Sequence, residues 1–241
     1  MGLSDLFKKG GSVPKCSAVI VAAGSSKRMG SDKLTALLGG EPVLLRTLRA
    51  FEASEYVSEI VVVTRMEKVP EVADLCAQNN ISKIAKVVAG GKTRMESSLI
   101  GVSSVKSGVK LIAIHDAARP LVSGALIKRC VTAAAEHMAA VPVIPSVDTL
   151  KMVGEDGRIV GTVDRETTYR VQTPQVFDAI LIKGALSKAA EKRMLLSDDS
   201  SAMDMTGFKT YTVAGEEDNI KITTPRDLMI AELLLKSRGE L

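Results

Sequence analysis

The segment that follows the first apolar run of the chain combines small residues with a cluster of cations. Residues 22–26 read Ala-Ala-Gly-Ser-Ser, and Lys27, Arg28 and Lys33 follow shortly afterwards. Small residues let backbone N–H groups approach phosphate oxygens closely, and cationic side chains neutralise phosphate charge. The segment is therefore interpreted as a phosphate-binding loop, against the alternative of a solvated basic turn.

Two common nucleotide-binding motifs do not fit the glycine pattern. Gly24 and Gly30 do not have the spacing of the dinucleotide-binding motif G-x-G-x-x-G, and no third glycine stands where that motif requires one. Dinucleotide binding is therefore disfavoured. Residues 91–93, Gly-Lys-Thr, imitate the end of a P-loop, but the first glycine of that motif would fall where the chain has Lys86. The sequence thus indicates anion binding by some other kind of loop.

Further polar segments stand between the apolar runs, at residues 115–120, 163–165, 172–175, 197–201 and 218–223. Taken alone, their residues have ordinary structural explanations. Asp116 could cap a turn at the end of a strand, and His115 is interpreted as a packed structural residue. Arg165 and Lys221 could be solvated surface charges. The pair Asp198-Asp199 could hold a metal ion, and it suits the start of a helix equally well.

Apolar strands alternate with amphipathic helices along the chain, and the polar segments named above lie at the ends of these strands and helices. Strands are predicted at residues 16–22, 60–64, 83–88, 111–114, 140–144 and 209–213, and helices at residues 42–53, 69–78, 93–105, 123–137, 179–191 and from 224 onwards. Such a pattern is typical of an α/β fold with a mostly parallel sheet and helices on both faces. Ligands of open α/β sheets bind outside the carboxyl ends of the strands, where the small-residue segment lies.

One interval departs from this alternation. Strand-like runs at residues 147–153 and 158–163 flank Gly-Glu-Asp-Gly, which is a hairpin signal. A two-stranded hairpin is only marginally stable alone in water, so this one is expected to pack on another subunit. The chain is therefore interpreted as a flexible tail over residues 1–14 and one α/β domain over residues 15–241, with an inserted dimerisation arm at residues 147–165.

The composition excludes several classes of protein. The chain has 241 residues, of which 46% are hydrophobic and 25% charged, and its apolar stretches are too short to span a membrane. Its three cysteines lie far apart, which gives neither a disulfide framework nor a zinc site and fits the reducing cytoplasm. The net charge of +4 suits an anionic small molecule or an RNA surface, but the absence of Trp leaves little for bases to stack on. A nucleic-acid partner and a membrane are not expected.

Taken in order, the polar segments resemble a known family. Ala-Ala-Gly-x-x-x-Arg-Met-Gly at residues 22–30 is similar to the opening of nucleotidyltransferases with a Rossmann-like fold. His-Asp-Ala-Ala-Arg-Pro at 115–120, Val-Asp-Arg at 163–165, Gln-Thr-Pro-Gln at 172–175 and Asp-Asn-Ile-Lys-Ile-Thr at 218–223 narrow the resemblance to cytidylyltransferases of sugar-alcohol phosphates. Ala22, Ala23 and Ala118 favour the 2-C-methyl-D-erythritol 4-phosphate cytidylyltransferase family over the ribitol 5-phosphate enzymes. The resemblance covers about residues 16–236.

The resemblance implies a cytoplasmic homodimer that transfers a cytidylyl group from CTP to methylerythritol phosphate in the non-mevalonate isoprenoid pathway. Mg²⁺ is expected on the phosphates of CTP, with no metal-binding side chains assigned. Catalytic roles are implied for Arg28 and Lys33, which would stabilise the α-phosphate, and for Arg165 and Lys221, which would position the acceptor. The cytidine pocket is implied at Ala22, Ala23, Gly24, Gly91 and Ser97. Acceptor contacts are implied at Asp116, Arg119, Thr173 and Ser197.

Two alternatives remain open at this point. The first is another sugar-phosphate nucleotidyltransferase, such as a ribitol 5-phosphate cytidylyltransferase. The second is a non-catalytic nucleotide- or RNA-binding module, which is supported only by the basic net charge. The chain also departs from the family's usual pattern at three places, with Ser197 in place of Thr, Lys92 in place of an acidic residue, and Ser-Asp-Lys-Leu at residues 31–34 in place of the more frequent Pro-Lys-Gln or Asn-Lys.

Overall fold

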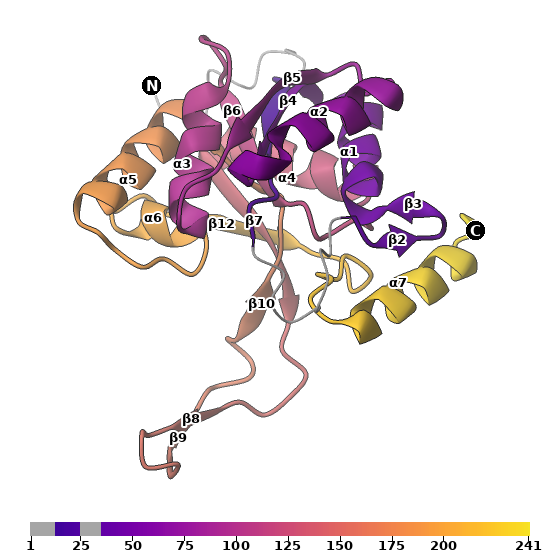
Figure 1. Cartoon of the computed structure of the whole chain (residues 1–241). Helices are drawn as coiled ribbons and strands as arrows, with labels where there is room; N and C mark the ends of the chain where they lie inside the picture. The colour runs from indigo at the N-terminus through magenta and orange to yellow at the C-terminus, as the bar shows by residue number, and fades with distance from the viewer. Residues whose placement is uncertain (1–12, 25–34) are drawn as a thin grey trace.

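The computed structural model describes residues 13–24 and 35–241 of the chain. Within these ranges an eight-stranded sheet forms the centre of the molecule, in the order β10-β7-β11-β6-β1-β4-β5, and β12 also pairs with β7 (Figure 1). The strands are β1 (Cys16–Val21), β4 (Val57–Thr64), β5 (Ile84–Ala89), β6 (Leu111–Asp116), β7 (Ala139–Pro145), β10 (Tyr169–Val171), β11 (Gln175–Asp178) and β12 (Tyr211–Ala214). The predicted tail lies outside the described residues up to position 12, and so do Arg28 and Lys33.

Most strand pairs in the sheet are parallel, as the alternating pattern predicts. β1 runs parallel to both β4 and β6, β4 to β5, and β12 to β7, whereas β10 and β11 pair in the antiparallel sense. The register between β1 and β6 places Val21 opposite Asp116. The two central strands therefore end side by side, and their carboxyl ends share one edge of the sheet.

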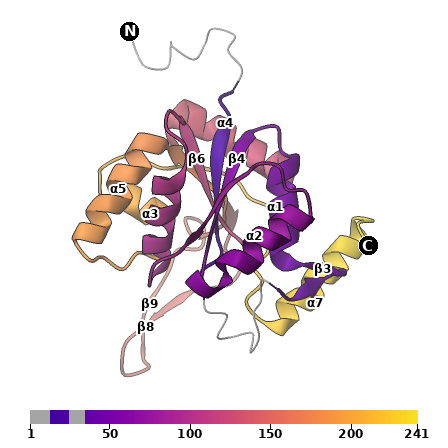
Figure 2. The same ribbon diagram turned by 45° about the horizontal axis from the view of Figure 1, so that its top comes forward.

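Helices cover both faces of the sheet (Figures 1 and 2). They are α1 (Val43–Ala53), α2 (Val69–Gln78), α3 (Arg94–Ser104), α4 (Gly124–His137), α5 (Ala179–Glu191), α6 (Ser200–Asp204) and α7 (Pro225–Ser237). Ala18 and Ile20 of β1 belong to a core with α1, α2 and α4, while Val19 faces a second core with α3, α5 and α6. No helix in the described part of the chain is long and apolar enough to cross a bilayer.

Helix α3 is fixed firmly at its N-terminus and lies close to the sheet. The Thr93 hydroxyl accepts the Glu96 N–H at 3.1 Å, and the Glu96 carboxylate accepts the Thr93 N–H, which completes a capping box. Further along, Gly101 faces β1 and β4 without a side chain. A Cβ atom there would lie 2.3 Å from Val19 Cγ1 and 2.8 Å from Val63 Cγ2. The absence of a side chain therefore lets α3 approach the sheet and fixes where its first turn lies.

This close approach predicts a large effect of a small substitution. Gly101→Ala should lower the free energy of unfolding by about 1–3 kcal/mol, because the added methyl overpacks the interface between α3 and β1. Gly184→Ala on α5 is the matched control, since no atom lies within 4 Å of a Cβ built there. The control should stabilise the fold by about 0.5–1 kcal/mol, as alanine does in an open helical position. Urea unfolding of both variants measures the difference, and equal effects would contradict the close packing of α3.

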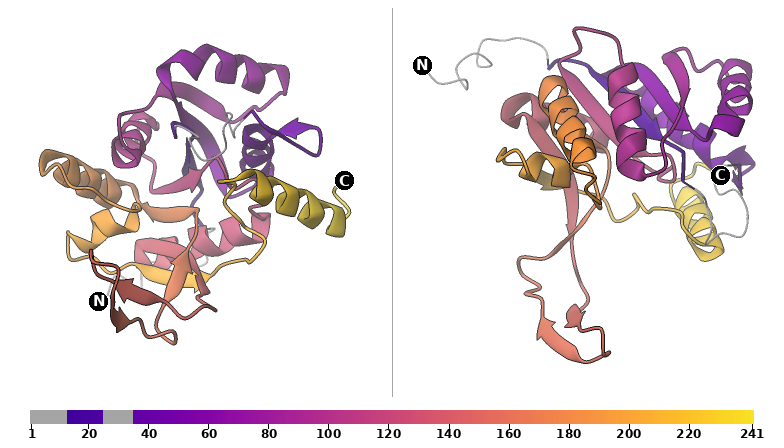
Figure 3. Two further views of the ribbon diagram at one scale, coloured as in Figure 1. Left: turned by 60° about the horizontal axis from the view of Figure 1, so that its bottom comes forward. Right: turned by 60° about the vertical axis from the view of Figure 1, so that its left-hand side comes forward.

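The hairpin predicted at residues 147–163 is present and projects away from the body of the molecule (Figure 3). Its strands are β8 (Lys151–Val153) and β9 (Ile159–Thr162), which pair antiparallel. Gly157 turns the chain with a φ of +79°, a conformation that favours glycine. Apolar side chains remain largely exposed along the arm, with 65% of Ile159 and 67% of Val160 accessible. The arm therefore offers an apolar surface that the described residues of its own chain leave uncovered.

The structure differs from the predicted elements in small ways. The polar residues 197–201 contain the start of α6, because the Asp198 carboxylate accepts the Ser201 N–H at 3.1 Å. The pair Asp198-Asp199 thus lies at the start of a helix, which is one of the two interpretations that the sequence allows. Two short strands, β2 (Leu37–Leu38) and β3 (Glu41–Pro42), and the turn η2 (Met66–Lys68) are additions that hydrophobic periodicity cannot reveal in segments so short.

Candidate active site

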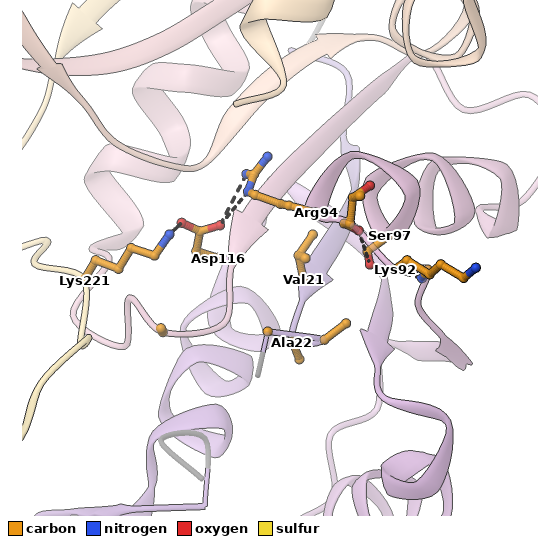
Figure 4. Close-up of a pocket in the computed structure, with 12 residues that line it drawn as sticks. Val21, Ala22, Lys92, Arg94, Ser97, Asp116 and Lys221 are labelled. Carbon is orange, nitrogen blue, oxygen red and sulfur yellow. Dashed lines mark hydrogen bonds and ion pairs between the residues drawn. The ribbon is translucent and has the colours of Figure 1, made fainter. Parts of the chain in front are cut away.

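A cavity of about 310 Å³ opens at the carboxyl ends of β1 and β6 (Figure 4). Segments far apart in the sequence contribute to it: the end of β1, the first turn of α3 with the residues before it, the end of β6 and the residues before α7. The lining residues are Val21, Ala22, Ala23, Gly24, Gly91, Lys92, Thr93, Arg94, Ser97, Asp116, Ala118 and Lys221. This is the edge where open α/β sheets bind their ligands.

Asp116 is the central anion of the cavity and pairs with cations on two sides. Arg94 Nη2 lies 3.2 Å from Asp116 Oδ1, and Lys221 Nζ lies 2.7 Å from Asp116 Oδ2. Burial alone would raise the pKa of the Asp116 carboxyl, but the Arg94 and Lys221 charges outweigh it and hold that pKa well below its ordinary value. The carboxylate is therefore ionised, and it orients two cations at the wall of the cavity.

A chain of hydrogen bonds fixes the backbone of Asp116 on the side away from the cavity. His115 is fully buried, and this burial lowers its pKa to about 3, so its ring is neutral. The ring donates from Nε2 to the Arg119 carbonyl oxygen at 3.2 Å. Nδ1 must then accept, and it takes the hydroxyl proton of Thr173 at 2.9 Å. The same Thr173 oxygen accepts the Asp116 N–H at 3.1 Å. His115 is thus the structural residue that the sequence indicates, and Thr173 holds the backbone of Asp116.

Arg119 joins this arrangement from a position beside the cavity where its side chain is only 11% exposed. Its Nη1 donates to the Asn219 carbonyl oxygen at 2.6 Å, and its Nε lies 4.0 Å from Asp116 Oδ2. Burial lowers the pKa of Arg119 despite the nearby Asp116 charge. Asn219 in turn donates to the Thr173 carbonyl oxygen at 2.9 Å. The segments around 173 and 219 are therefore locked together, which places Lys221 at the cavity.

The opposite wall is the turn before α3. The buried Ser97 hydroxyl accepts the Gly91 N–H at 3.2 Å and donates to the Thr93 carbonyl oxygen at 2.9 Å. Gly90 must be small at this turn, since a Cβ would lie 2.7 Å from Ala23 Cβ and 2.8 Å from Ser97 Oγ. The two small-residue segments thus lie against each other, with backbone groups and the N-terminus of α3 facing the cavity.

The structure brings together most of the residues proposed from the sequence. The cavity is lined by Ala22, Ala23, Gly24, Gly91, Ser97, Asp116 and Lys221. Arg119 and Thr173 lie behind Asp116, while Ser197 is exposed before α6 and Arg165 is exposed at the base of the arm. The described residues therefore form one cavity with the nucleotide and acceptor candidates on adjoining walls, but Arg165 does not line it.

Arg94 belongs to the pattern Gly90-Gly91…Arg94…Ser97 that supports the family resemblance, but the sequence assigned it no role. Its side chain extends from the first turn of α3 across the cavity to Asp116 (Figure 4). A signal was available, because Arg94 directly follows the capping residue Thr93 at the start of a helix that faces the cavity. Nothing in the sequence, however, places the end of β6 opposite that helix.

Comparison with known proteins decides which family this arrangement represents. Residues 16–237 match the family model described as 2-C-methyl-D-erythritol 4-phosphate cytidylyltransferase. The chain belongs to this family. It is 42% identical to the 2-C-methyl-D-erythritol 4-phosphate cytidylyltransferase of Caldanaerobacter subterraneus over 227 residues, which span 91% of this chain and 98% of that protein. It is 41% identical to the enzyme of that name from Halalkalibacterium halodurans, over 92% of this chain and 97% of the relative.

Solved structures of the 2-C-methyl-D-erythritol 4-phosphate cytidylyltransferase family share the fold. The 4-diphosphocytidyl-2C-methyl-D-erythritol synthase of Anaerococcus prevotii matches with a TM-score of 0.82 and 30% identity, over 92% of this chain and 96% of that one. The 2-C-methyl-D-erythritol 4-phosphate cytidylyltransferase of Thermus thermophilus matches with a TM-score of 0.77 and 31% identity, over 92% and 99% of the two chains. The expected fold class and family are thereby confirmed.

Proposed function

We propose that the chain transfers the cytidylyl group of CTP to 2-C-methyl-D-erythritol 4-phosphate in the cytoplasm, as a step of non-mevalonate isoprenoid biosynthesis. The observation that carries this proposal is the cavity at the ends of β1 and β6. It collects the small-residue segment at 22–24, Gly91, the cations Arg94 and Lys221, and the carboxylate of Asp116. Membership of the family supports the reaction, and the cavity supports its location.

In this reaction an acceptor phosphate oxygen attacks the α-phosphorus of CTP. A new phosphorus–oxygen bond forms, the bond between the α-phosphorus and the bridging oxygen breaks, and pyrophosphate leaves with that oxygen. Two anions must meet, so the protein chiefly supplies positive charge and alignment. We assign Lys221 to the acceptor phosphate, because its ammonium lies at the cavity wall and is held by Asp116 at 2.7 Å. Arg28 and Lys33, outside the described residues, are proposed to act on the α-phosphate.

We place the cytidine on the wall formed by residues 22–24, Gly91 and Ser97. The small side chains leave room for a base beside the backbone, and the first turn of α3 faces the same space. The acceptor is proposed to lie toward Asp116 and Arg119, with Thr173 behind them and Ser197 as a further acceptor contact. This division keeps each substrate beside the residues that family resemblance assigns to it.

A specific loss of nucleotide affinity is expected when the turn before α3 is loosened. Ser97→Ala removes the hydroxyl that accepts the Gly91 N–H, so KM for CTP should rise by the equivalent of about 0.5–1.5 kcal/mol. KM for the acceptor should change less. Ser104→Ala is the matched control at the other end of α3, where the hydroxyl donates only to the Ile100 carbonyl oxygen. Steady-state kinetics with each substrate varied in turn measures both KM values. An equal rise of the two would contradict the position of Ser97 in the nucleotide pocket.

We propose that Mg²⁺ binds mainly through the phosphate oxygens of CTP. Among the described residues no group of three or more His, Cys, Asp or Glu side chains is placed to hold a metal ion. The carboxylate of Asp116 is already paired with Arg94 and Lys221. Mg²⁺ on triphosphate oxygens and water matches the ligands this ion favours. When bound there it would neutralise phosphate charge and stabilise the pyrophosphate leaving group.

The arm is proposed to join two chains in a homodimer and to exchange between them. Val153, Ile159 and Val160 stay exposed on it, and an apolar surface of this kind is stabilised by a second copy. Arg165 lies exposed at the base of the arm, and no ion pair of its guanidinium with another described residue is present. We propose that Arg165 completes the active site of the partner subunit.

The reaction is tested by a panel of nucleotides and acceptors in which pyrophosphate release is measured. CTP with methylerythritol phosphate should give the highest kcat/KM, whereas UTP, GTP and ATP should be poor donors. Ribitol 5-phosphate is the informative alternative acceptor. A preference for ribitol 5-phosphate would retain the nucleotidyltransferase chemistry and overturn the proposed acceptor.

A further inference from the structure

We propose that Asp199 is a positioning residue that holds the Arg94 guanidinium across the cavity wall. Arg94 Nη2 lies 2.8 Å from Asp199 Oδ2 and 3.2 Å from Asp116 Oδ1, so one guanidinium bridges two carboxylates. Asp199 comes from the start of α6, and Asp116 from the end of β6. This inference rests on the proposed function, because it assigns a further role at the same site.

The two carboxylates and two cations form a row of alternating charge. Lys221, Asp116, Arg94 and Asp199 follow one another through ion pairs of 2.7, 3.2 and 2.8 Å. Only the first three line the cavity, and Asp199 lies at the end of the row behind it. Asp199 therefore acts on the reaction through Arg94 and not by touching a substrate.

The buried carboxylate of Asp199 has the Arg94 guanidinium as its main counterpart, and the Ser98 side chain also favours its charged form. The Asp199 side chain is only 1% exposed, and neither carboxylate oxygen accepts a well-aligned hydrogen bond from the described residues. Burial raises the pKa of the Asp199 carboxyl, and the Arg94 charge is the main influence that opposes this rise. A buried ion pair of this kind contributes little net stability, and its removal on one side leaves an uncompensated charge. Alignment of Arg94 is the role that the geometry supports.

The backbone around Asp199 is itself held in place. The Gln175 side-chain carbonyl accepts the N–H groups of Asp199 and Ser200 at 3.2 and 3.0 Å, and its amide donates to Asp198 at 2.8 Å. Asp199 thus has a fixed position relative to β11. Through Arg94 it joins the segment that carries Ser197 to the first turn of α3, so it aligns the acceptor side of the cavity with the nucleotide side.

Two substitutions at this position separate charge from packing. Asp199→Asn keeps the shape but presents a neutral amide to Arg94, and we expect kcat/KM for the acceptor to fall about 100-fold, as for a small misplacement in an active site. Asp199→Glu adds a methylene but keeps the carboxylate, and it should recover a large part of that loss. A packing role would give the reverse order, because asparagine disturbs the core less than glutamate.

Asp204→Asn is the matched control, since Asp204 lies exposed at the other end of α6 and its carboxylate makes no ion pair with another described residue. It should stay within a few-fold of the wild type. If Asp199→Asn fails to fold, Arg94→Lys decides the question, because a compact ammonium cannot bridge both carboxylates. Arg94→Lys should show the same loss in kcat/KM for the acceptor with a native melting curve.

Wild-type kinetics for either folded variant, or Asp199→Glu worse than Asp199→Asn, would overturn the positioning role. The failure of the proposed function has a different signature, since the wild-type protein would then not form the cytidylyl product at all.

Discussion

Replacement of Lys221 by alanine is expected to lower kcat by about 10²–10³-fold, the effect of removing one group that stabilises developing charge. The Lys221 ammonium lies at the cavity wall, 2.7 Å from Asp116 Oδ2, and its side chain is 38% exposed. It is therefore both oriented by the protein and open to an incoming phosphate. KM for CTP should change much less, because the cytidine wall is built from other segments.

Two further variants make this prediction specific. Lys221→Arg should also be slow, since a planar guanidinium does not replace a compact ammonium beside Asp116. Lys236→Ala on α7 is the matched control, because that lysine pairs with Glu232 at 3.0 Å on the surface. Steady-state kinetics would contradict the assignment if Lys221→Ala raised KM and left kcat unchanged, which is the pattern of uniform ground-state binding.

Mixing two inactive variants is expected to restore activity if arms are exchanged between subunits. Lys221→Ala damages the body of the site, and Arg165→Ala damages the arm. With random pairing, half of the dimers contain one chain of each kind. Each mixed dimer then has one intact site and one doubly damaged site, so activity should return to roughly a quarter of the wild type.

The same mixture can show the opposite result clearly. If Arg165 serves the cavity of its own chain, no combination of the two variants contains an intact site. Activity would then stay at the background of the single variants, provided that subunit exchange is demonstrated with labelled chains. A shortened arm lacking residues 150–162 serves as a second check, since it should yield monomers with little activity.

The sequence predicts the fold well because the strands and helices of the body have clear periodicity. β1 is apolar except for Ser17, and β4 contains the apolar run at residues 60–63. Helix α3 begins at a capping box that the sequence shows as Thr93 followed by Glu96. The hairpin can be predicted from the turn residues at 154–157. Shorter elements cannot be predicted in this way, because two-residue strands such as β2 are too short to show a hydrophobic period.

The site is less predictable because its contacts join segments that lie far apart in the sequence. Asp116 could be singled out from its motif, but its partners Arg94 and Lys221 meet it only through the register of β6 beside β1 and the fold of the C-terminal segment. Asp199 was ambiguous between a helix start and a metal ligand. The structure gives it a third role, as the buried partner of Arg94.

The chemistry at the centre of this account is the attack of an acceptor phosphate oxygen on the α-phosphorus of CTP. Methylerythritol phosphate labelled with ¹⁸O in its phosphate group, incubated with CTP, Mg²⁺ and the wild-type protein, tests it directly by ³¹P NMR. We expect a diphosphate product in which both phosphorus signals carry the isotope shift of a bridging ¹⁸O, together with unlabelled pyrophosphate. A cytidylyl phosphorus without the shift, label in the pyrophosphate, or release of CMP alone would contradict it.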